Sequence, residues 1–239
     1  MPSPSTLTAS RPSTGESAGA RRIMLIGPGF RFLSGLSVYT CRMANALADS
    51  HDVSAILLDR LIPRRLYPGA GRVGHDLTSM RYDDRVRVLG HLDWYWGASI
   101  VTLRRTLRRE RPDVIVLQWW TAAALHTYLL VARLAAREGI PVVIEFHEVQ
   151  DTGEASVPVV AAYCRRYLRR LVAAAAGAIC HTEHDAGLLA SALGIEALAE
   201  LPVRLAPHGH YDHLALPTRE SPAGPVSDAD RRQRPSRVL

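Results

Sequence analysis

The stretch DVIVLQWWTAAALHTYLLVARLAAREGIPVVIEFHE, residues 113–148, contains the pattern from which the fold can be inferred. Two short apolar runs, DVIVLQ at 113–118 and PVVIEFH at 141–147, have the length of buried strands. Residues 121–138 between them have the 3.6-residue period of a helix, and Gly-Ile-Pro at 139–141 ends it because proline cannot continue a helical turn. This arrangement predicts two parallel strands joined by a right-handed helical crossover.

The same alternation continues on both sides of this stretch. Strand-length apolar runs recur at 23–27, 53–58, 86–90, 178–182 and 203–207. Segments with helical periodicity lie at 36–49, 97–110, 156–175 and 183–193. Strands that alternate with helices predict an α/β fold, a doubly wound and mostly parallel Rossmann-like sheet of about seven strands with helices on both faces.

The two ends of the chain differ in composition from the middle. Residues 1–20 hold Ser, Thr, Pro, Gly and Ala with little to bury, and residues 217–239 combine proline and arginine without a helical or strand period. Segments of this kind bury too little apolar surface to offset the conformational entropy that the chain loses when it becomes ordered. We therefore expect a disordered leader at 1–20, one domain at 21–216 and a disordered tail at 217–239.

The overall composition excludes several classes of protein. With 239 residues, of which 47% are hydrophobic, the chain can bury a core, which excludes a wholly disordered or fibrous protein. No apolar run approaches the roughly 20 residues of a membrane span, and the start lacks the pattern of a secretory signal. The cysteines Cys41, Cys164 and Cys180 are widely spaced in apolar surroundings and predict free thiols in a reducing compartment. We expect a cytoplasmic protein.

The positive charge of the chain consists of arginine alone. The net charge is +6, and all 29 basic residues are arginine, as a GC-rich genome would favour. Two predicted helices carry arginine stripes, Arg104, Arg105, Arg108 and Arg109 in one and Arg165, Arg166, Arg169 and Arg170 in the other. Such stripes suit an anionic lipid surface or an ordinary solvated helix face, and both interpretations stay open. Neither RNA-binding aromatic motifs nor a helix-turn-helix spacing is present, so we expect no nucleic-acid partner.

A glycine loop, GPGFRFLSG at 27–35, follows the first predicted strand and precedes a helix. Backbone N–H groups at such a position can bind a phosphate, although a plain tight turn has the same sequence. Phe32 stands where the dinucleotide-binding motif has its third glycine, and the absence of lysine excludes a P-loop. Asp59 at the end of the second predicted strand could contact a ribose, so an NAD-binding or methyl-donor-binding enzyme stays an alternative.

Histidines follow three of the predicted strands. His147 ends the run at 141–147, where it can hydrogen-bond a polar ligand or the loop backbone. The sequence HEVQD that begins there lacks the second histidine of a helical zinc motif. The groups HTEH at 181–184 and HGHYDH at 208–213 have no second ligand cluster at a metal-site spacing. We expect no metal and no cofactor.

Two tryptophans, Trp119 and Trp120, follow the apolar run at 113–118. Paired indoles at a strand end can stack on a sugar or on a lipid head group. Core packing of at least one of the two rings is the simpler interpretation.

Four short sequence features, some of them described above, occur in a fixed order along the chain. They are the glycine loop that ends at Ser34-Gly35, Asp52-Val53 at the second strand, Phe-His-Glu at 146–148, and Pro-His-Gly followed by aspartate at 207–212. Together they resemble the N-terminal half of a GT-B glycosyltransferase of the retaining family 4 type, over about residues 22–216. The resemblance implies one wall of a two-domain cleft and transfer of a sugar from a nucleotide-sugar with retention of configuration and without a metal.

The resemblance also implies roles for positions of this chain. His147 corresponds to a catalytic histidine that contacts the donor sugar. The implied donor-binding positions are Gly29, Ser34, Gly35, His208 and Gly209, with His208 in place of the more common asparagine. The implied acceptor-binding positions are Tyr39, Trp119, Trp120, Glu148, Asp151 and Glu154. The implied partners are a nucleotide-sugar donor, a glycan or lipid-linked acceptor, and an anionic membrane contacted peripherally at the inner face of the plasma membrane.

Family members of this type have a second Rossmann-like domain that holds the nucleotide and stabilises the leaving diphosphate. We expect this C-terminal donor domain to be missing after residue 216, and the chain by itself to be weakly active or inactive. The Arg, Pro and Ser bias of the last residues suggests a frameshift or truncation near residue 226. The alternatives are the NAD-binding or methyl-donor-binding enzyme and a noncatalytic module that binds a glycan or lipid acceptor.

Overall fold

The structure is a computed structural model that describes residues 19–29, 35–60, 81–93, 97–149, 158–193 and 201–208. The chain divides into two compact units, residues 1–207 and 208–239. All helices and strands described below belong to the first unit. The tail expected at 217–239, and all but the last two residues of the leader expected at 1–20, lie outside the described residues.

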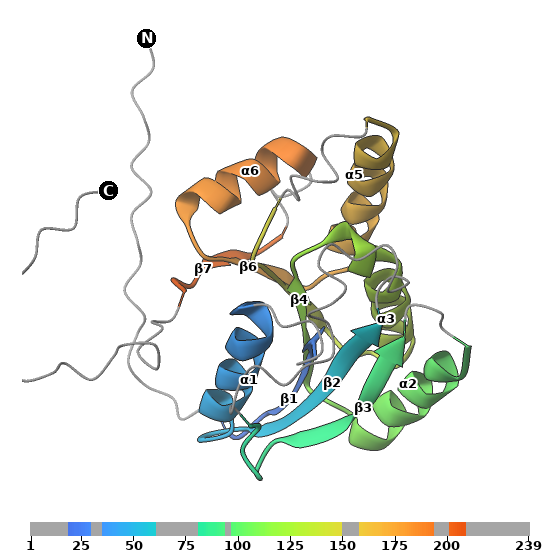
Figure 1. Cartoon of the computed structure of the whole chain (residues 1–239), viewed down its shortest axis with the longest axis vertical. Coiled ribbons are helices and arrows are strands. Elements are labelled where there is room, and N and C mark those ends of the chain that lie inside the picture. The colour runs from blue at the N-terminus through green and yellow to red at the C-terminus, as the bar shows by residue number, and fades with distance from the viewer. Residues whose placement is uncertain are drawn as a thin grey trace, which may run out of the picture. The chain divides into compact units, whose positions relative to one another are not determined.

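The first unit is built on a seven-stranded sheet with the order β3-β2-β1-β4-β5-β6-β7 (Figure 1). The strands are β1 (Arg22–Pro28), β2 (Asp52–Arg60), β3 (Arg87–Asp93), β4 (Val114–Trp119), β5 (Val142–Phe146), β6 (Gly177–Cys180) and β7 (Val203–Leu205). Every neighbouring pair of these strands is parallel. The predicted seven-stranded α/β fold is confirmed, and the sheet is parallel throughout.

Helices connect these strands near the positions that the periodicity predicts. They are α1 (Gly35–Leu47), α2 (Gly97–Glu110), α3 (Leu125–Arg137), α5 (Pro158–Ala173) and α6 (Glu183–Leu193). The helix expected at 121–138 begins with a separate 3-10 turn, η3 (Ala122–Ala124), because the Thr121 side chain accepts a hydrogen bond from the Ala123 N–H. The helix expected at 156–175 corresponds to α5, which ends at Ala173, two residues earlier than expected, while residues 156 and 157 lie outside the described residues.

The ends of three helices follow from their local sequence. Arg111, with φ of 44°, adopts the left-handed conformation directly after α2, and Pro112 prevents the helix from continuing. Gly139, with φ of 69°, has the same role after α3 at no steric cost. At the start of α6, the Thr182 hydroxyl oxygen accepts the Asp185 N–H at 3.0 Å, as expected of a helix cap.

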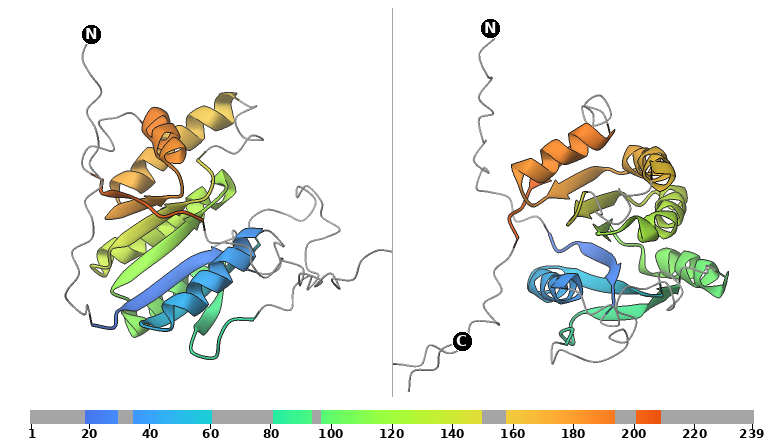
Figure 2. Two further views of the ribbon diagram at one scale, coloured as in Figure 1. Left: turned by 90° about the vertical axis from the view of Figure 1, so that its left-hand side faces the viewer. Right: turned by 45° about the horizontal axis from the view of Figure 1, so that its top comes forward.

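Hydrophobic side chains cover both faces of the sheet, because successive residues of a strand point to opposite faces. Leu25 of β1 packs in a cluster with Ala44 of α1. Its neighbour Ile26 belongs to a larger cluster to which α2, α3, α5 and α6 contribute, with Leu107 and Tyr128 among its members. Figures 1 and 2 show α1 on one side of the β1–β2 pair and α2 and α3 on the other.

Gly27 of β1 allows an unusually close contact across the sheet. A Cβ at this position would lie 2.9 Å from Gln118 Cγ on β4 and 3.2 Å from Thr40 Cγ2 on α1. Real Cβ atoms hardly ever come so close to another atom, so a larger residue would displace Gln118. The glycine therefore lets α1 and β4 pack against β1 immediately below the end of the strand.

The sheet reverses its winding between β1 and β4. From β1 the chain proceeds to β2 and β3 on one side, and from β4 it proceeds to β5, β6 and β7 on the other. In open α/β sheets, ligands bind beyond the carboxyl ends of the strands at such a reversal. Among the described residues, no helix has the length and apolar character needed to cross a membrane.

Candidate functional site

A buried carboxylate, Glu145 on β5, lies near the carboxyl edge of the sheet beside the reversal. The residue is 1% exposed. Its Oε1 accepts a hydrogen bond from the Tyr39 hydroxyl at 2.6 Å, and its Oε2 accepts one from Gln118 Nε2 at 2.6 Å. Two short bonds to a carboxylate stabilise it in surroundings from which water is excluded.

Gln118 on β4 connects this carboxylate to a histidine. The side chain is fully buried. Its Nε2 faces Glu145 Oε2 and also lies 3.5 Å from the sulfur of Met43, while its Oε1 lies 2.6 Å from His147 Nε2. The amide therefore bridges an acid on one side and an imidazole on the other.

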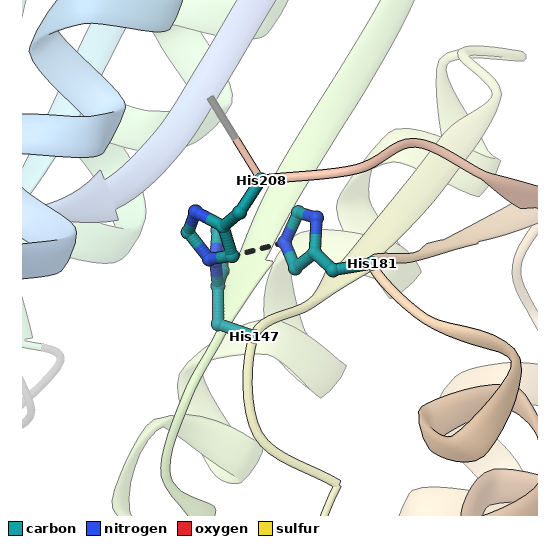
Figure 3. Close-up of side chains that lie close together, drawn as sticks. All are labelled: His147, His181 and His208. Atoms are coloured by element: carbon teal, nitrogen blue, oxygen red, sulfur yellow. Dashed lines mark hydrogen bonds between the residues drawn. The ribbon is translucent and has the colours of Figure 1, made fainter. Parts of the chain in front are cut away.

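His147 in turn contacts a second histidine, His181, which follows β6 (Figure 3). Their nitrogens, His147 Nδ1 and His181 Nε2, are 3.0 Å apart. The other nitrogen of His181, Nδ1, lies 2.8 Å from the carbonyl oxygen of Ala206. His181 Nε2 also lies 3.8 Å from Glu145 Oε1. The five side chains Tyr39, Glu145, Gln118, His147 and His181 are called the polar network below.

The register of the sheet brings these residues together. Gln118 and Glu145 are paired across β4 and β5, so their side chains emerge on the same face. Phe146 pairs with Cys180, and the residues that follow them are His147 and His181. The ring of Tyr39 on α1 covers the pair edge-on, with centroid distances of 4.7 Å to His147 and 5.7 Å to His181.

A tyrosine in the core, Tyr128, hydrogen-bonds the backbone of a network residue. The Tyr128 hydroxyl on α3 donates to the backbone carbonyl of Gln118 at 2.7 Å. The ring is fully buried, and this burial raises the pKa of Tyr128 well above its ordinary value. Tyr128 therefore remains a neutral donor and holds the end of β4 in position.

Two cavities lined by described residues lie away from the polar network. One of about 530 Å³ opens at the amino edge of the sheet, between Arg22, Asp113 and Pro141. The other, of about 300 Å³, lies between α3 and α5, beside His126 and Tyr167. Neither lining includes a residue of the network.

The donor-binding positions implied by the resemblance lie in different surroundings. Gly29 donates its N–H to the Leu58 carbonyl at 3.1 Å, and its carbonyl accepts the Ser37 hydroxyl at 2.9 Å, so its backbone polar groups serve the turn. Gly35 is exposed as the first residue of α1. Ser34 and Gly209 lie outside the described residues. His208, which Figure 3 also labels, is exposed and is the first residue of the second unit.

The acceptor-binding positions implied by the resemblance also differ from one another in burial. Tyr39 is half-buried within the polar network. Trp119 is 4% exposed in the core cluster, as the simpler interpretation of the tryptophan pair expected for one of the rings, whereas Trp120 is half-buried. Glu148 is exposed. Asp151 and Glu154 lie outside the described residues.

Gln118 was not among the residues expected at the site, and His181 was expected only as a member of a histidine group. A signal for Gln118 was present, because it is a lone amide at the end of an otherwise apolar strand. His181 has the same position after its strand as His147 has after the strand beside it. The expectation that no metal or cofactor binds stays a prediction.

Three solved structures are among those to which this chain is similar. UDP-GlcNAc 2-epimerase from Neisseria meningitidis bound to UDP-GlcNAc is 12% identical, with 78% of this chain and 47% of that chain covered and a TM-score of 0.49. Anabaena HepE in complex with UDP is 13% identical, with coverages of 79% and 44% and a TM-score of 0.45. UDP-GlcNAc 2-epimerase from Methanocaldococcus jannaschii is 16% identical, with coverages of 77% and 45% and a TM-score of 0.43.

The chain thus spans less than half the length of these three proteins. No curated protein sequence matches the chain. The family model described as "Glycosyl transferase 4-like domain" matches residues 34–209, which include all five residues of the polar network. The chain belongs to the glycosyltransferase 4-like domain family.

Proposed function

We propose that this chain is the acceptor-side half of a retaining glycosyltransferase that takes its sugar from a nucleotide-sugar donor. The observation that carries the proposal is the polar network around His147, which lies at the reversal of a sheet in a chain of this family. Ligands of doubly wound folds bind at this position. The exposed start of α1 at Gly35 adds a helix N-terminus, which favours the phosphates of a donor.

In this proposal the chain's own residues bind and orient rather than perform covalent chemistry. His147 lies against the donor sugar, and the start of α1 faces the donor phosphates. The half-buried ring of Trp120 and the exposed carboxylate of Glu148 are the described groups offered to the acceptor. The leaving diphosphate is stabilised chiefly by a second domain, so the chain alone turns over little or no donor.

A fusion enzyme tests this proposal. The chain is joined after residue 216 to the donor-binding domain of a family 4 glycosyltransferase, and release of nucleoside diphosphate is measured with a panel of nucleotide-sugars. We expect release from the fusion and almost none from the chain alone. His147→Ala should remove most of the release, while His184→Ala, at an exposed position on α6, should leave it unchanged.

Two results would favour the alternatives. Tight binding of NAD or of a methyl donor by the chain alone would support the dinucleotide-type or methyl-donor-type enzyme. Binding of a glycan or lipid-linked acceptor without turnover in any fusion would support the noncatalytic module. Turnover by the chain alone at ordinary enzyme rates would contradict the need for a second domain.

Peripheral contact with an anionic membrane is part of the proposal, and α5 is the helix that favours it. All four arginines of its stripe are exposed, and no ion pair is found for them among the described residues. On α2, by contrast, Arg108 pairs with Glu138 at 2.7 Å and Arg109 pairs with Glu110 at 2.7 Å. Guanidinium groups that are already paired add less attraction to a lipid surface.

Vesicle sedimentation distinguishes the two helices. Changing the four α5 arginines to glutamine should abolish binding to vesicles that contain anionic lipid. The same change of the four α2 arginines should reduce it less, and neutral vesicles should bind neither protein. Equal loss from both sets of substitutions would contradict a specific role of α5.

A further inference from the structure

Some atoms around the polar network can accept hydrogen bonds but cannot donate them. These atoms determine which partner donates in each hydrogen bond of the network. The Ala206 carbonyl lies 2.8 Å from His181 Nδ1, so that nitrogen carries a proton. A carbonyl oxygen has no proton to offer, and no other direction forms this bond. The remaining nitrogen of His181, Nε2, is the one that faces His147.

Met43 fixes the orientation of the Gln118 amide. The atom that faces Glu145 Oε2 at 2.6 Å also lies 3.5 Å from the Met43 sulfur, and both of these partners accept. Only the NH₂ end of the amide has two protons to donate, so the nitrogen lies there. The oxygen end of Gln118 therefore faces His147 Nε2, at 2.6 Å.

His147 must consequently donate from Nε2, because Gln118 Oε1 only accepts. Each imidazole now carries one proton on the nitrogen that points away from the other ring. The two facing nitrogens, His147 Nδ1 and His181 Nε2, are 3.0 Å apart. Two neutral rings would bring two lone pairs together, whereas one additional proton between them forms a hydrogen bond.

Charge balance independently supports the additional proton. Glu145 is 1% exposed, and a buried carboxylate that stays ionised needs a positive partner. Among the described residues, the basic group within ion-pair distance of Glu145 is His181, at 3.8 Å between Nε2 and Oε1. The side chains of this pair are 4% and 2% exposed, so water does not screen the charges.

We propose that His147 and His181 share one proton and together form a single buried cation that neutralises Glu145, with Gln118 and Tyr39 as the residues that position it. The pair holds three N–H protons on its two rings. Because both nitrogens of His147 are bonded within the protein, the ring offers a ligand its charge and not a further N–H.

The consequence for ligand binding rests on the proposed glycosyl transfer, whereas the shared proton does not. The carboxylate is 1% exposed, whereas His147 is half-buried and is the more exposed of the two rings. The network thus presents its positive end toward the carboxyl edge of the sheet. The class of ligand that this favours is one that carries negative charge, such as a nucleotide-sugar donor whose sugar lies against His147.

Nitrogen NMR of the full chain labelled with ¹⁵N-histidine tests the shared proton without any donor or acceptor. At neutral pH, His147 Nδ1 and His181 Nε2 should carry one proton between them, so that at most one of the two gives the signal of an unprotonated nitrogen. Glu145→Gln removes the counter-charge at nearly constant volume, and both nitrogens should then give that signal. Tyr39→Phe keeps the carboxylate and should retain the shared proton.

His184→Asn is the control, because it identifies the signal of an exposed histidine. Two neutral rings in the unsubstituted chain would overturn the proposal. Retention of the third proton in Glu145→Gln, with the fold verified by its amide spectrum, would overturn the role of Glu145. If Glu145→Gln does not fold, the unsubstituted and Tyr39→Phe spectra still decide the protonation of the pair. Failure of the fusion enzyme to release diphosphate would leave these spectra unchanged.

Discussion

The Tyr39 hydroxyl donates to Glu145 Oε1 at 2.6 Å, across 106 positions of sequence, and thereby joins α1 to the central part of the sheet. This bond crosses the reversal between β1 and β4, since α1 follows β1 and Glu145 lies on β5. One buried carboxylate thus connects the part of the fold that contains β1 with the part that contains β4 and β5.

Tyr39→Phe removes this donor and leaves the carboxylate with one fewer hydrogen bond. We expect the free energy of unfolding to fall by about 1–3 kcal/mol, as for other buried groups that lose a partner. Urea denaturation measures the change. The control is Tyr167→Phe, which deletes the hydroxyl of a half-buried tyrosine on α5 whose ring lies against Arg170. An equal loss in both variants would argue against a special role of the Tyr39 bond.

Gly27→Ala should overpack the contact between β1 and β4. The new Cβ would lie 2.9 Å from Gln118 Cγ, so Gln118 must shift, at a cost of about 1–3 kcal/mol. Thermal denaturation is the measurement. Gly187→Ala is the matched control, because its Cβ would meet nothing within 4 Å on α6. That substitution should stabilise the chain by about 0.5–1 kcal/mol through helix propensity.

Gln118→Glu should make stability depend on pH. A second carboxylate would lie beside Glu145, and one of the two must hold a proton in the folded state, which raises its pKa there. The folded state then binds more protons than the unfolded state, so this contribution is present at low pH and is lost as pH rises. We expect a loss of about 3–5 kcal/mol at neutral pH that diminishes toward acid.

Denaturation midpoints measured from neutral to acidic pH test this dependence. Gln118→Leu removes the same hydrogen bonds without adding a titratable group. Its stability relative to the unsubstituted chain should therefore change little over the same range. Parallel pH profiles for the two variants would contradict the repulsion between carboxylates.

Cys164 should be the reactive thiol of the native chain. Burial raises the pKa of Cys41 and of Cys180 to about 11, which keeps both as neutral thiols at mildly alkaline pH. Both are buried, whereas Cys164 on α5 is half-buried. A thiol reagent should therefore label one cysteine per native chain and three after denaturation. Cys164→Ser should abolish the native-state labelling, and rapid labelling of Cys41 would refute the burial argument.

The sequence was sufficient for the elements of the fold, because each strand is a short apolar run and each helix has an apolar stripe. The run at 113–118 and the helix at 121–138 correspond to β4 and to η3 with α3. Their parallel direction follows from the helical connection between them. The order of the strands does not follow from such local patterns, because it depends on which distant strands pair.

In the site, too, a residue could be predicted from its local sequence, whereas its contacts with residues distant in sequence could not. His147 could be predicted from its place at the end of a strand. The partnership of Gln118 with Glu145 depends on the register of β4 and β5, and that of His181 on the register of β5 and β6. Trp119 and Trp120 are adjacent in sequence, yet only Trp119 is in the core, because it ends a central strand that is covered on both faces.

The chain of hydrogen bonds from Tyr39 to Ala206 has a consequence for how the first unit unfolds. Separating α1 from β5 would remove one of the two donors of a buried carboxylate, and separating β6 from β5 would separate the two histidines. Neither α1 nor β6 can separate from β5 while the polar network keeps all of its hydrogen bonds. We therefore expect the amides of β1 and of β5 to exchange with solvent through one common event, so that the sheet behaves as a single cooperative unit.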